Sequence, residues 1–507
     1  MANPDLPRSA AGPNSPWLLA IIVSIATFME VLDTTIANVA LRHIAGSLAA
    51  SQDESTYILT SYLVSNAVVL PISGWLSNVI GRKRFYMGCV TIFTLSSVAC
   101  AFAPNLGMML FFRVLQGIGG GGLAPTEQSI FADSFTPKQR ALAFAMYGIT
   151  VVTAPAIGPV LGGWLTDNYS WEWVFLINLP VGIVSLGLTW WFVYDSEKVK
   201  EDRRKLLAKG LKIDYVGFAL IILGFGVLQI VLDRFERDDG FSSPFISVMT
   251  AICVVSLVAL VIWELIVDQP VMNLRLFRNR AFAISNIVMF TFGFIIISTT
   301  QLLPQLTQDL MGYDATTAGL TLGLGGLATI FIMPIAGLIT GPIQPRYLVC
   351  MALTGTGFAL WHTSGVDLNI SFWDVSLSRM LQVIWLPFIF IPLSAVQFIG
   401  VPPDKNPDAS AIINLMRNLG GGWGVSVATT QLQWREQFHH ARLVEHVTPY
   451  NGYGYGIDLS AIARAVTTQA AILSYLDVFT LLSVVAFLLA PVALLLPRAE
   501  KGAAAGH

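Results

Sequence analysis

Long apolar stretches recur along the whole 507-residue chain, and short polar segments separate them. Most are about 20 residues long, the length that an α-helix needs to cross roughly 30 Å of hydrocarbon. The pattern therefore predicts an all-α integral membrane protein rather than a β-barrel. We expect fourteen spans, at residues 17–38, 56–76, 85–103, 106–131, 141–165, 173–194, 213–232, 244–267, 282–303, 316–340, 346–363, 376–399, 409–434 and 475–496.

Composition supports the membrane assignment and excludes several other classes of protein. Hydrophobic residues make up 54% of the chain and charged residues only 12%, whereas an ordinary soluble domain holds roughly 25% charged residues. The net charge of −2 gives no indication of nucleic-acid binding. All four cysteines lie in predicted spans, so neither a disulfide framework nor a metal site is indicated; they are Cys89, Cys100, Cys253 and Cys350.

The distribution of Lys and Arg predicts the orientation, because cytoplasmic segments of membrane proteins carry the excess of these residues. With the N-terminus inside, the cytoplasmic segments hold 20 of the 29 and the outer loops hold six. Both tails, 1–16 and 498–507, are then cytoplasmic, as is the basic loop 199–212, which we interpret as a solvated connection. Residues 1–16 show no convincing cleavage site, so span 17–38 is expected to remain as an anchor.

Two motifs recur in the second half of the chain at nearly the same offset. GWLSNVIGRKRF (74–85) has a degenerate copy in GLITGPIQPRYL (337–348), and LFFRVLQG (110–117) has one in SLSRMLQV (376–383). Two independent matches at similar offsets indicate a duplication. The second match pairs Arg113 with Arg379 and Gln116 with Gln382.

Such a duplication predicts two six-helix halves, residues 17–198 and 269–497, on either side of two inserted helices at 213–268. Parallel repeats place a substrate cavity at their interface near the middle of the bilayer, and rocking of the halves opens it to each side in turn. The organisation therefore favours a transporter. An outer loop at 435–473 interrupts the second half.

Span 17–38 carries two acidic residues, Glu30 and Asp33, where a charge costs roughly 2.5–3.5 kcal/mol unless it faces a cavity, pairs or titrates. Being three residues apart, the two share one helix face. Arg113 is expected at a depth similar to that of Asp33. These residues favour a proton switch. The alternative is a permanent structural pair of Asp33 and Arg113, with Glu30 idle in a wet cavity.

Further polar and aromatic residues are candidates for proton or substrate binding. Glu127 is either a second proton or cation site or a residue of a solvated inner vestibule that binds nothing. For the cavity residues, ordinary helix packing is an equally good explanation. The residues expected at the cavity are Asn38, Gln116, Asn286, Phe290, Phe294, Arg379, Trp385, Phe388, Asn414 and Arg417.

Small residues and prolines predict where helices approach closely or bend. QGIGGGG (116–122) follows no strand, so helix packing is favoured over a phosphate-binding loop. APAIGPVLGG (154–163) adds two prolines, which permit a bend. GRKR (81–84) either docks against Asp133 or only anchors the inner face. The residues expected to act in conformational change are Gly74, Gly81, Arg82, Asp133, Pro155, Gly158, Pro159, Gly162 and Gly163.

Together these segments resemble the fourteen-helix drug:proton antiporter branch of the major facilitator superfamily. LDTTIANVAL (32–41) is similar to the span 1 motif of that branch, LFFRVLQG to its span 4 motif, and AIGPVLGG to its span 5 motif. The resemblance implies proton coupling at Asp33 and a proton relay at Arg113. Three residues depart from the pattern: Asn78 and Val79 replace an aspartate and an arginine, and Arg42 replaces a proline.

Two further segments, WEWVFLINLPVG (171–182) and WREQFHHARLVEHVTPYN (434–451), resemble the EmrB type of efflux pump within this branch. The resemblance implies a bacterial inner-membrane location, small hydrophobic drugs as substrates and protons as the coupling ion, without a cofactor. It also implies a periplasmic adaptor of the EmrA type and an outer-membrane channel of the TolC type.

The function favoured by the sequence is a proton-driven exporter of varied hydrophobic compounds. One alternative is a dedicated exporter of a single metabolite or siderophore on the same scaffold. An alternative of another class is a non-transporting membrane receptor or scaffold, which leaves the buried acids unexplained. An enzyme is disfavoured, because the sequence shows no nucleophile–base constellation, metal spacing or cofactor loop above background.

Overall fold

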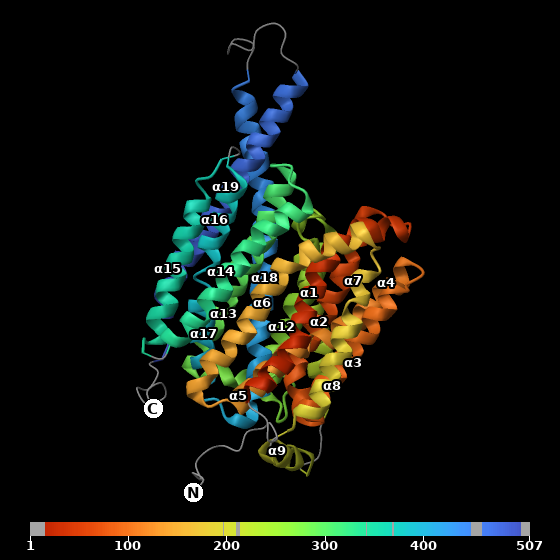
Figure 1. The fold of residues 1–507 in the computed structure, drawn as a ribbon, viewed down its shortest axis with the longest axis vertical. Coiled ribbons are helices and arrows are strands. Elements are labelled where there is room, and N and C mark those ends of the chain that lie inside the picture. The colour runs from red at the N-terminus through yellow and green to blue at the C-terminus, as the bar shows by residue number, and fades with distance from the viewer. Residues whose placement is uncertain are drawn as a thin grey trace.

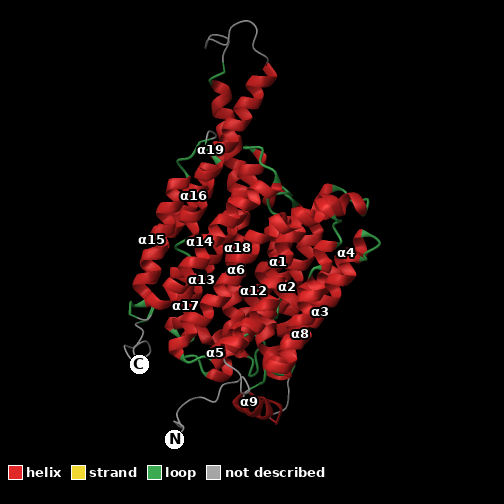
Figure 2. Ribbon diagram, in the orientation of Figure 1, coloured by secondary structure: helices red, strands yellow, loops and turns green. Residues whose placement is uncertain are grey.

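The computed structural model describes residues 16–195, 197–208, 213–340, 342–367, 370–447 and 459–497. All regular elements in these ranges are helical, so the all-α prediction is confirmed (Figure 2). Most of the predicted N-terminal tail, the whole C-terminal tail and parts of the segments 199–212 and 435–473 lie outside the described residues.

The first half contains eight helical segments, because two of its predicted spans are interrupted. Residues 106–131 are divided at Gly121 and Gly122, and residues 173–194 at Ile177. The helices are α1 (Pro16–Ser47), α2 (Gln52–Ile80), α3 (Arg82–Ala101), α4 (Leu106–Gly120), α5 (Leu123–Ser134), α6 (Pro137–Asn168), α7 (Trp173–Leu176) and α8 (Asn178–Phe192).

The inserted helices and the second half follow α9 (Glu197–Ala208). The inserted pair consists of α10 (Tyr215–Ile221), the π-helix η1 (Ile222–Gly226), α11 (Val227–Arg234), the short η2 (Gly240–Ser242) and α12 (Pro244–Ile266). The second half consists of η3 (Leu274–Arg278), α13 (Arg280–Asp309), α14 (Ala315–Ile339), α15 (Pro345–Thr363), α16 (Phe372–Val383), α17 (Pro387–Val396), η4 (Pro403–Lys405), α18 (Asn406–Glu445) and α19 (Leu459–Ala493).

A helix lies at each of the fourteen predicted spans. By length and apolar composition, eleven described helical segments are able to cross a membrane, or twelve when the bent α6 counts as one span. The two remaining predicted spans correspond to α15 and α18, which are helical but are not among the apolar candidates. The count of fourteen therefore stays a prediction.

The duplication is visible in how helices begin. Ser51 and Asp314 are the N-caps of α2 and α14, and their offset along the chain equals that of the motif shared by those two helices. Asn105 and Ser371 cap α4 and α16 with the offset of the second motif. Each side chain accepts a hydrogen bond from a backbone N–H of the first turn, which satisfies a donor that the helix leaves unpaired.

Two segments that the sequence presented as loops are largely helical. Most of 199–212 belongs to α9, where Glu197 pairs with Lys200 and Glu201 with Lys205 one turn apart. In 435–473, α18 continues to Glu445 and α19 begins at Leu459, so both described flanks are helix. Figure 1 shows α18 and α19 projecting from the bundle at the end opposite α9. We call the α9 side the inner end and the other side the outer end.

The two halves are joined by polar contacts at the inner end. The Asn78 amide of α2 donates to Asp408 of α18 at 3.0 Å, and the Asn406 amide donates to Asp133 at the end of α5 at 2.8 Å. Asp133 also forms an ion pair with Arg82 of its own half. The docking interpretation of the 81–84 cluster therefore fits the structure. Because α2 and α5 both contact α18, the bundle is closed at this end.

Glycines allow the backbones of α13 and α18 to touch. A Cβ atom on Gly420 of α18 would overlap the carbonyl oxygen of Phe290, and one on Gly293 of α13 would overlap that of Arg417. Lipid tails are as apolar as the helix surfaces, so no hydrophobic driving force brings membrane helices together. Their association depends instead on close van der Waals packing of this kind.

We predict that Gly420→Ala destabilises the protein by about 1–3 kcal/mol, the usual cost of overpacking a rigid contact. The matched control is Gly187→Ala in α8, where an added Cβ meets no atom within 4 Å. Thermal unfolding of both variants in detergent measures the difference. Equal unfolding temperatures for the two variants would contradict the close approach of α13 and α18.

Candidate functional site

The centre of the first half is a fully buried ion pair between Asp33 of α1 and Arg113 of α4. The guanidinium donates to one carboxylate oxygen at 2.8 Å, and both side chains have 0% exposure. The other oxygen accepts hydrogen bonds from Gln116 at 2.9 Å and from Asn178 at 2.6 Å. All contacts to the carboxylate therefore come from donors, and they tie α1 to α4 and to the first residue of α8.

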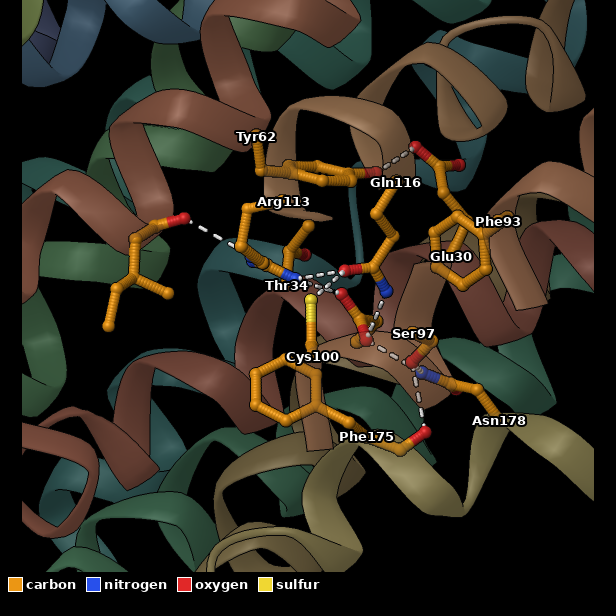
Figure 3. Close-up of polar contacts among 12 residues, drawn as sticks. Glu30, Thr34, Tyr62, Phe93, Ser97, Cys100, Arg113, Gln116, Phe175 and Asn178 are labelled. Carbon is orange, nitrogen blue, oxygen red and sulfur yellow. Dashed lines mark hydrogen bonds and ion pairs between the residues drawn. The ribbon is translucent and has the colours of Figure 1, made fainter. Parts of the chain in front are cut away.

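Arg113 is held by its surroundings as well as by its counter-ion. Its Nε donates to the backbone carbonyl of Ile58 in α2 at 3.1 Å, and its terminal nitrogen also donates to Gln116 at 2.7 Å. The guanidinium lies 4.8 Å from the ring centre of Tyr62 and 5.6 Å from that of Phe175 (Figure 3). Cation–π contacts of this kind are strongest where water is excluded.

Glu30, one turn before Asp33, belongs to a separate but adjoining set of hydrogen bonds. Its carboxylate accepts from the Tyr62 hydroxyl at 3.1 Å and from the Asn66 amide at 3.3 Å. Glu30 is half-buried, whereas Asp33 is buried. Because the Tyr62 ring covers Arg113 while its hydroxyl donates to Glu30, this one side chain links Glu30 to the arginine of the Asp33–Arg113 pair (Figure 3).

Glu127 of α5 is completely buried in the first half. One carboxylate oxygen accepts a hydrogen bond from Ser24 of α1 at 2.5 Å. The other oxygen has no hydrogen-bond partner among the described residues. A buried carboxylate with an unpaired oxygen is costly as a charge, so the site suits a group that gains and loses a proton.

The second half presents Arg417 of α18 to these acids. Its guanidinium donates to the Tyr147 hydroxyl of α6 at 2.6 Å, across the interface between the halves. It also attracts the carboxylates of Glu30 and Glu127 electrostatically. Nearby, Asn414 exchanges two hydrogen bonds with Gln128 of α5.

The remaining predicted cavity residues lie in different surroundings. Asn38 is exposed and lines a pocket of about 130 Å³ with Thr34, Thr35, Leu59, Tyr62 and Leu63. Asn286 is buried and donates to the Phe282 carbonyl of its own helix.

The aromatic cavity candidates lie against other helices or against the core. Phe290 and Phe294 are half-buried ring neighbours on α13. Trp385 lies against Gly355 of α15, and Phe388 packs against the core. Arg379 and Gln382 hydrogen bond to each other on α16.

The predicted conformational residues occupy helix contacts and turns. Gly74 touches the backbone of Asp408 across the interface between the halves, and Gly81 has a φ of +97°, which favours glycine. Helix α6 bends by 40° after Pro155. Its later glycines pack closely: Gly158 against Thr35, Gly162 against Ile36 and Gly163 against Thr316, while Gly319 of α14 packs against Pro159.

Several partners of the buried charges were not found from the sequence. Tyr62, Asn66, Asn178 and Tyr147 are ordinary residues within apolar spans, and only their contacts single them out. Asn178 does lie in the segment 171–182, whose resemblance to efflux pumps was a usable signal.

These features define a helical membrane protein built from two related halves around buried charges. Comparison with known proteins agrees: the sequence model of the Major Facilitator Superfamily matches residues 23–425, and the chain belongs to this superfamily of membrane transporters. It is 36% identical to the multidrug export protein EmrB of Escherichia coli K12 over 91% of each chain. It is 34% identical to the fatty acid resistance protein FarB of Neisseria gonorrhoeae over 97% of this chain and 98% of FarB.

Solved structures support the fold at low sequence identity. The proton:xylose symporter XylE superposes with a TM-score of 0.61 at 14% identity, over 96% of each chain. The human organic anion transporter MFSD10 gives a TM-score of 0.60 at 14% identity, over 93% of this chain and all of that one. The prediction of a major facilitator fold is therefore confirmed.

We predict that Arg113→Gln costs about 3–5 kcal/mol of stability, because it leaves a buried carboxylate without its counter-ion. Adding Asp33→Asn in the same chain should recover much of this loss, since two neutral amides hydrogen bond without a charge. Thermal unfolding in detergent of the parent, both single variants and the double variant measures the coupling. Glu201→Gln with Lys205→Gln on exposed α9 is the control pair and should show no coupling. If the double variant is no more stable than Arg113→Gln, the buried Asp33 carboxylate does not depend on Arg113 as its counter-ion, and the prediction is wrong.

Proposed function

We propose that this chain is a proton-coupled antiporter that exports hydrophobic drugs and other toxic compounds by alternating access. Its membrane is the inner membrane of a bacterium, and both termini face the cytoplasm. The observation that carries the proposal is the buried Asp33–Arg113 pair, together with two further acids of the same half, Glu30 and Glu127, that lie outside that pair. The multidrug export relatives support the same activity.

Protonation of Asp33 would change how α1 is held. The carboxylate accepts hydrogen bonds from Arg113, Gln116 and Asn178. A carboxylic acid carries its own donor hydrogen, so one of these donors would lose its acceptor. A proton arriving from outside would therefore loosen α1 from α4 and α8, which gives the proton a direct effect on helix packing.

Glu30 and Glu127 are the proposed carriers that connect proton movement with cargo. Both feel the positive charge of Arg417 in the opposite half, so any change in the separation of the halves alters how well their charged forms are stabilised. Entry of one proton through a potential of 100 mV supplies roughly 2.3 kcal/mol. This free energy would drive the exchange of protons for a drug.

Opening toward the cytoplasm requires separation of the halves at the inner end. The hydrogen bonds from Asn78 to Asp408 and from Asn406 to Asp133 would break, and Gly74 would leave the backbone of α18. The bend of α6 after Pro155, together with the small residues of that helix, is the proposed flexible element.

We predict that adding a transported drug to the purified protein releases protons, and that Asp33→Asn, Glu30→Gln and Glu127→Gln each reduce this release. Each substitution removes a group able to hold the proton while keeping a similar shape. A pH indicator in weakly buffered detergent solution reports the release, and Glu201→Gln on exposed α9 is the control expected to match the parent. Unchanged release in all three variants would remove the proton-site assignment.

The projecting ends of α18 and α19 are the proposed contact for a periplasmic adaptor of the EmrA type, which would connect the pump to a channel of the TolC type. Arg435 and His439 of α18 both reach Asp477 of α19, at 2.5 and 2.6 Å, and this cluster braces the two helices. Trp434 and Phe438 are 60% and 45% exposed beside it. Exposed aromatic residues on a braced hairpin are suited to protein contacts.

We predict that Trp434→Ala with Phe438→Ala lowers co-purification of a co-expressed EmrA-type adaptor at least about tenfold, as expected for the loss of aromatic anchors. Drug-induced proton release in detergent should be unaffected. Trp373→Ala, which removes an exposed tryptophan from α16 instead, is the control and should retain the adaptor. Full retention of the adaptor by the double variant would exclude this surface as the contact.

A further inference from the structure

The second half contains a counterpart of the Asp33–Arg113 site with different chemistry. Arg379 of α16 is the repeat equivalent of Arg113 in the motif shared by α4 and α16. Gln382 accepts a hydrogen bond from Arg379 at 3.4 Å, as Gln116 does from Arg113. The two arginines therefore occupy the same place in the two halves.

The counterpart lacks the carboxylate. Where Arg113 meets Asp33, the guanidinium of Arg379 donates to the hydroxyl of Thr299 at 3.0 Å and to that of Thr300 at 2.7 Å. Arg379 is only 6% exposed. Within the part of the chain that the structure describes, no carboxylate lies within ion-pair distance of it. A buried guanidinium is thus held by neutral acceptors alone.

The counterpart also lacks the aromatic cover. In the first half the ring of Tyr62 lies over Arg113, whereas Gly325 stands at the equivalent position of α14, by the offset that relates α2 to α14. The backbone of Gly325 lies beside the aliphatic part of Arg379, which supports the pairing of these positions. The Nε atom of Arg379 has no acceptor among the described residues, although the Nε of Arg113 donates to the backbone of α2.

We propose that Arg379, together with Thr299 and Thr300, binds the carboxylate of an anionic amphipathic cargo. The cargo would supply the counter-charge that Asp33 supplies in the first half, and its apolar part would remain among the helices. This inference rests on the proposed export function and names a substrate class for it. A guanidinium is well suited to this role because its donors form a fork that matches the two oxygens of a carboxylate.

The position of the site suits a cargo that leaves toward the outside. Helix α16 begins at Phe372 at the outer end, and Arg379 lies about two turns further on, or roughly 10 Å along the helix. Thr300 is only half-buried, so its side of the guanidinium is the side nearest to open space. A carboxylate that reaches Arg379 is therefore close to the outer face.

The proposal is tested with two probes of the same chain length and opposite charge, the anion dodecanoate and the cation dodecyltrimethylammonium. Their binding is measured by tryptophan fluorescence on the full-length protein in lipid nanodiscs without a proton gradient. The decisive variants are Thr299→Asp, which installs an internal counter-ion, and Thr299→Asn, which has nearly the same shape without the charge. Arg379→Gln and Arg379→Lys form a second matched pair.

We expect Thr299→Asp and Arg379→Gln to weaken dodecanoate binding by about tenfold or more, the loss of one charge-assisted contact. Thr299→Asn should keep most of it, and Arg379→Lys should weaken it less than Arg379→Gln, because lysine keeps the charge but not the fork of donors. Dodecyltrimethylammonium should bind all four variants alike. The proposal is overturned if Thr299→Asp binds dodecanoate as tightly as Thr299→Asn, or if binding of the cationic probe falls equally. A parent protein that binds dodecanoate but shows no proton-driven export would contradict the proposed function instead.

Discussion

The structure of the first half depends on one buried ion pair. A single charge within a membrane helix costs roughly 2.5–3.5 kcal/mol on insertion scales, and Asp33 and Arg113 offset each other's cost with the help of further donors and acceptors around them. The pair and its partners join four helices, α1, α2, α4 and α8, at one point. Any change in the charge of Asp33 must therefore be felt by the packing of the whole half.

The repeated motif of α4 and α16 gives the protein two versions of this site, and the two differ in charge. The first half carries three acids within its spans, Asp33, Glu30 and Glu127, which are the proposed proton sites. The second half carries two arginines within its spans, Arg379 and Arg417, whose hydrogen bonds in the described part of the chain go to neutral partners. Of the two arginines, Arg417 reaches across the interface between the halves to Tyr147, whereas Arg379 contacts residues of its own half.

Much of the fold followed from the sequence because the determining signals are local or repeated. Span length, the nearly equal offsets of the two repeated motifs and the depth of Arg113 relative to Asp33 all follow from helices with a fixed rise per residue. The partners Tyr62, Asn66 and Asn178 were missed, since a lone polar residue in an apolar span does not reveal which neighbour it meets. The helical character of residues 199–208 was missed because a charged segment lacks the apolar periodicity that marks a packed helix.

The departure of Asn78 from the family pattern acquires a physical reason in the structure. Asn78 donates its amide to Asp408 of the other half, and an aspartate at this position would instead place two carboxylates together. A second neutral donor, Asn406, makes the matching contact to Asp133. In the part of the chain that the structure describes, amide–carboxylate hydrogen bonds therefore join the two halves at the inner end. Each such contact contributes only about 1.5–3 kcal/mol, so the hydrogen bonds that join the halves at this end are few and individually modest.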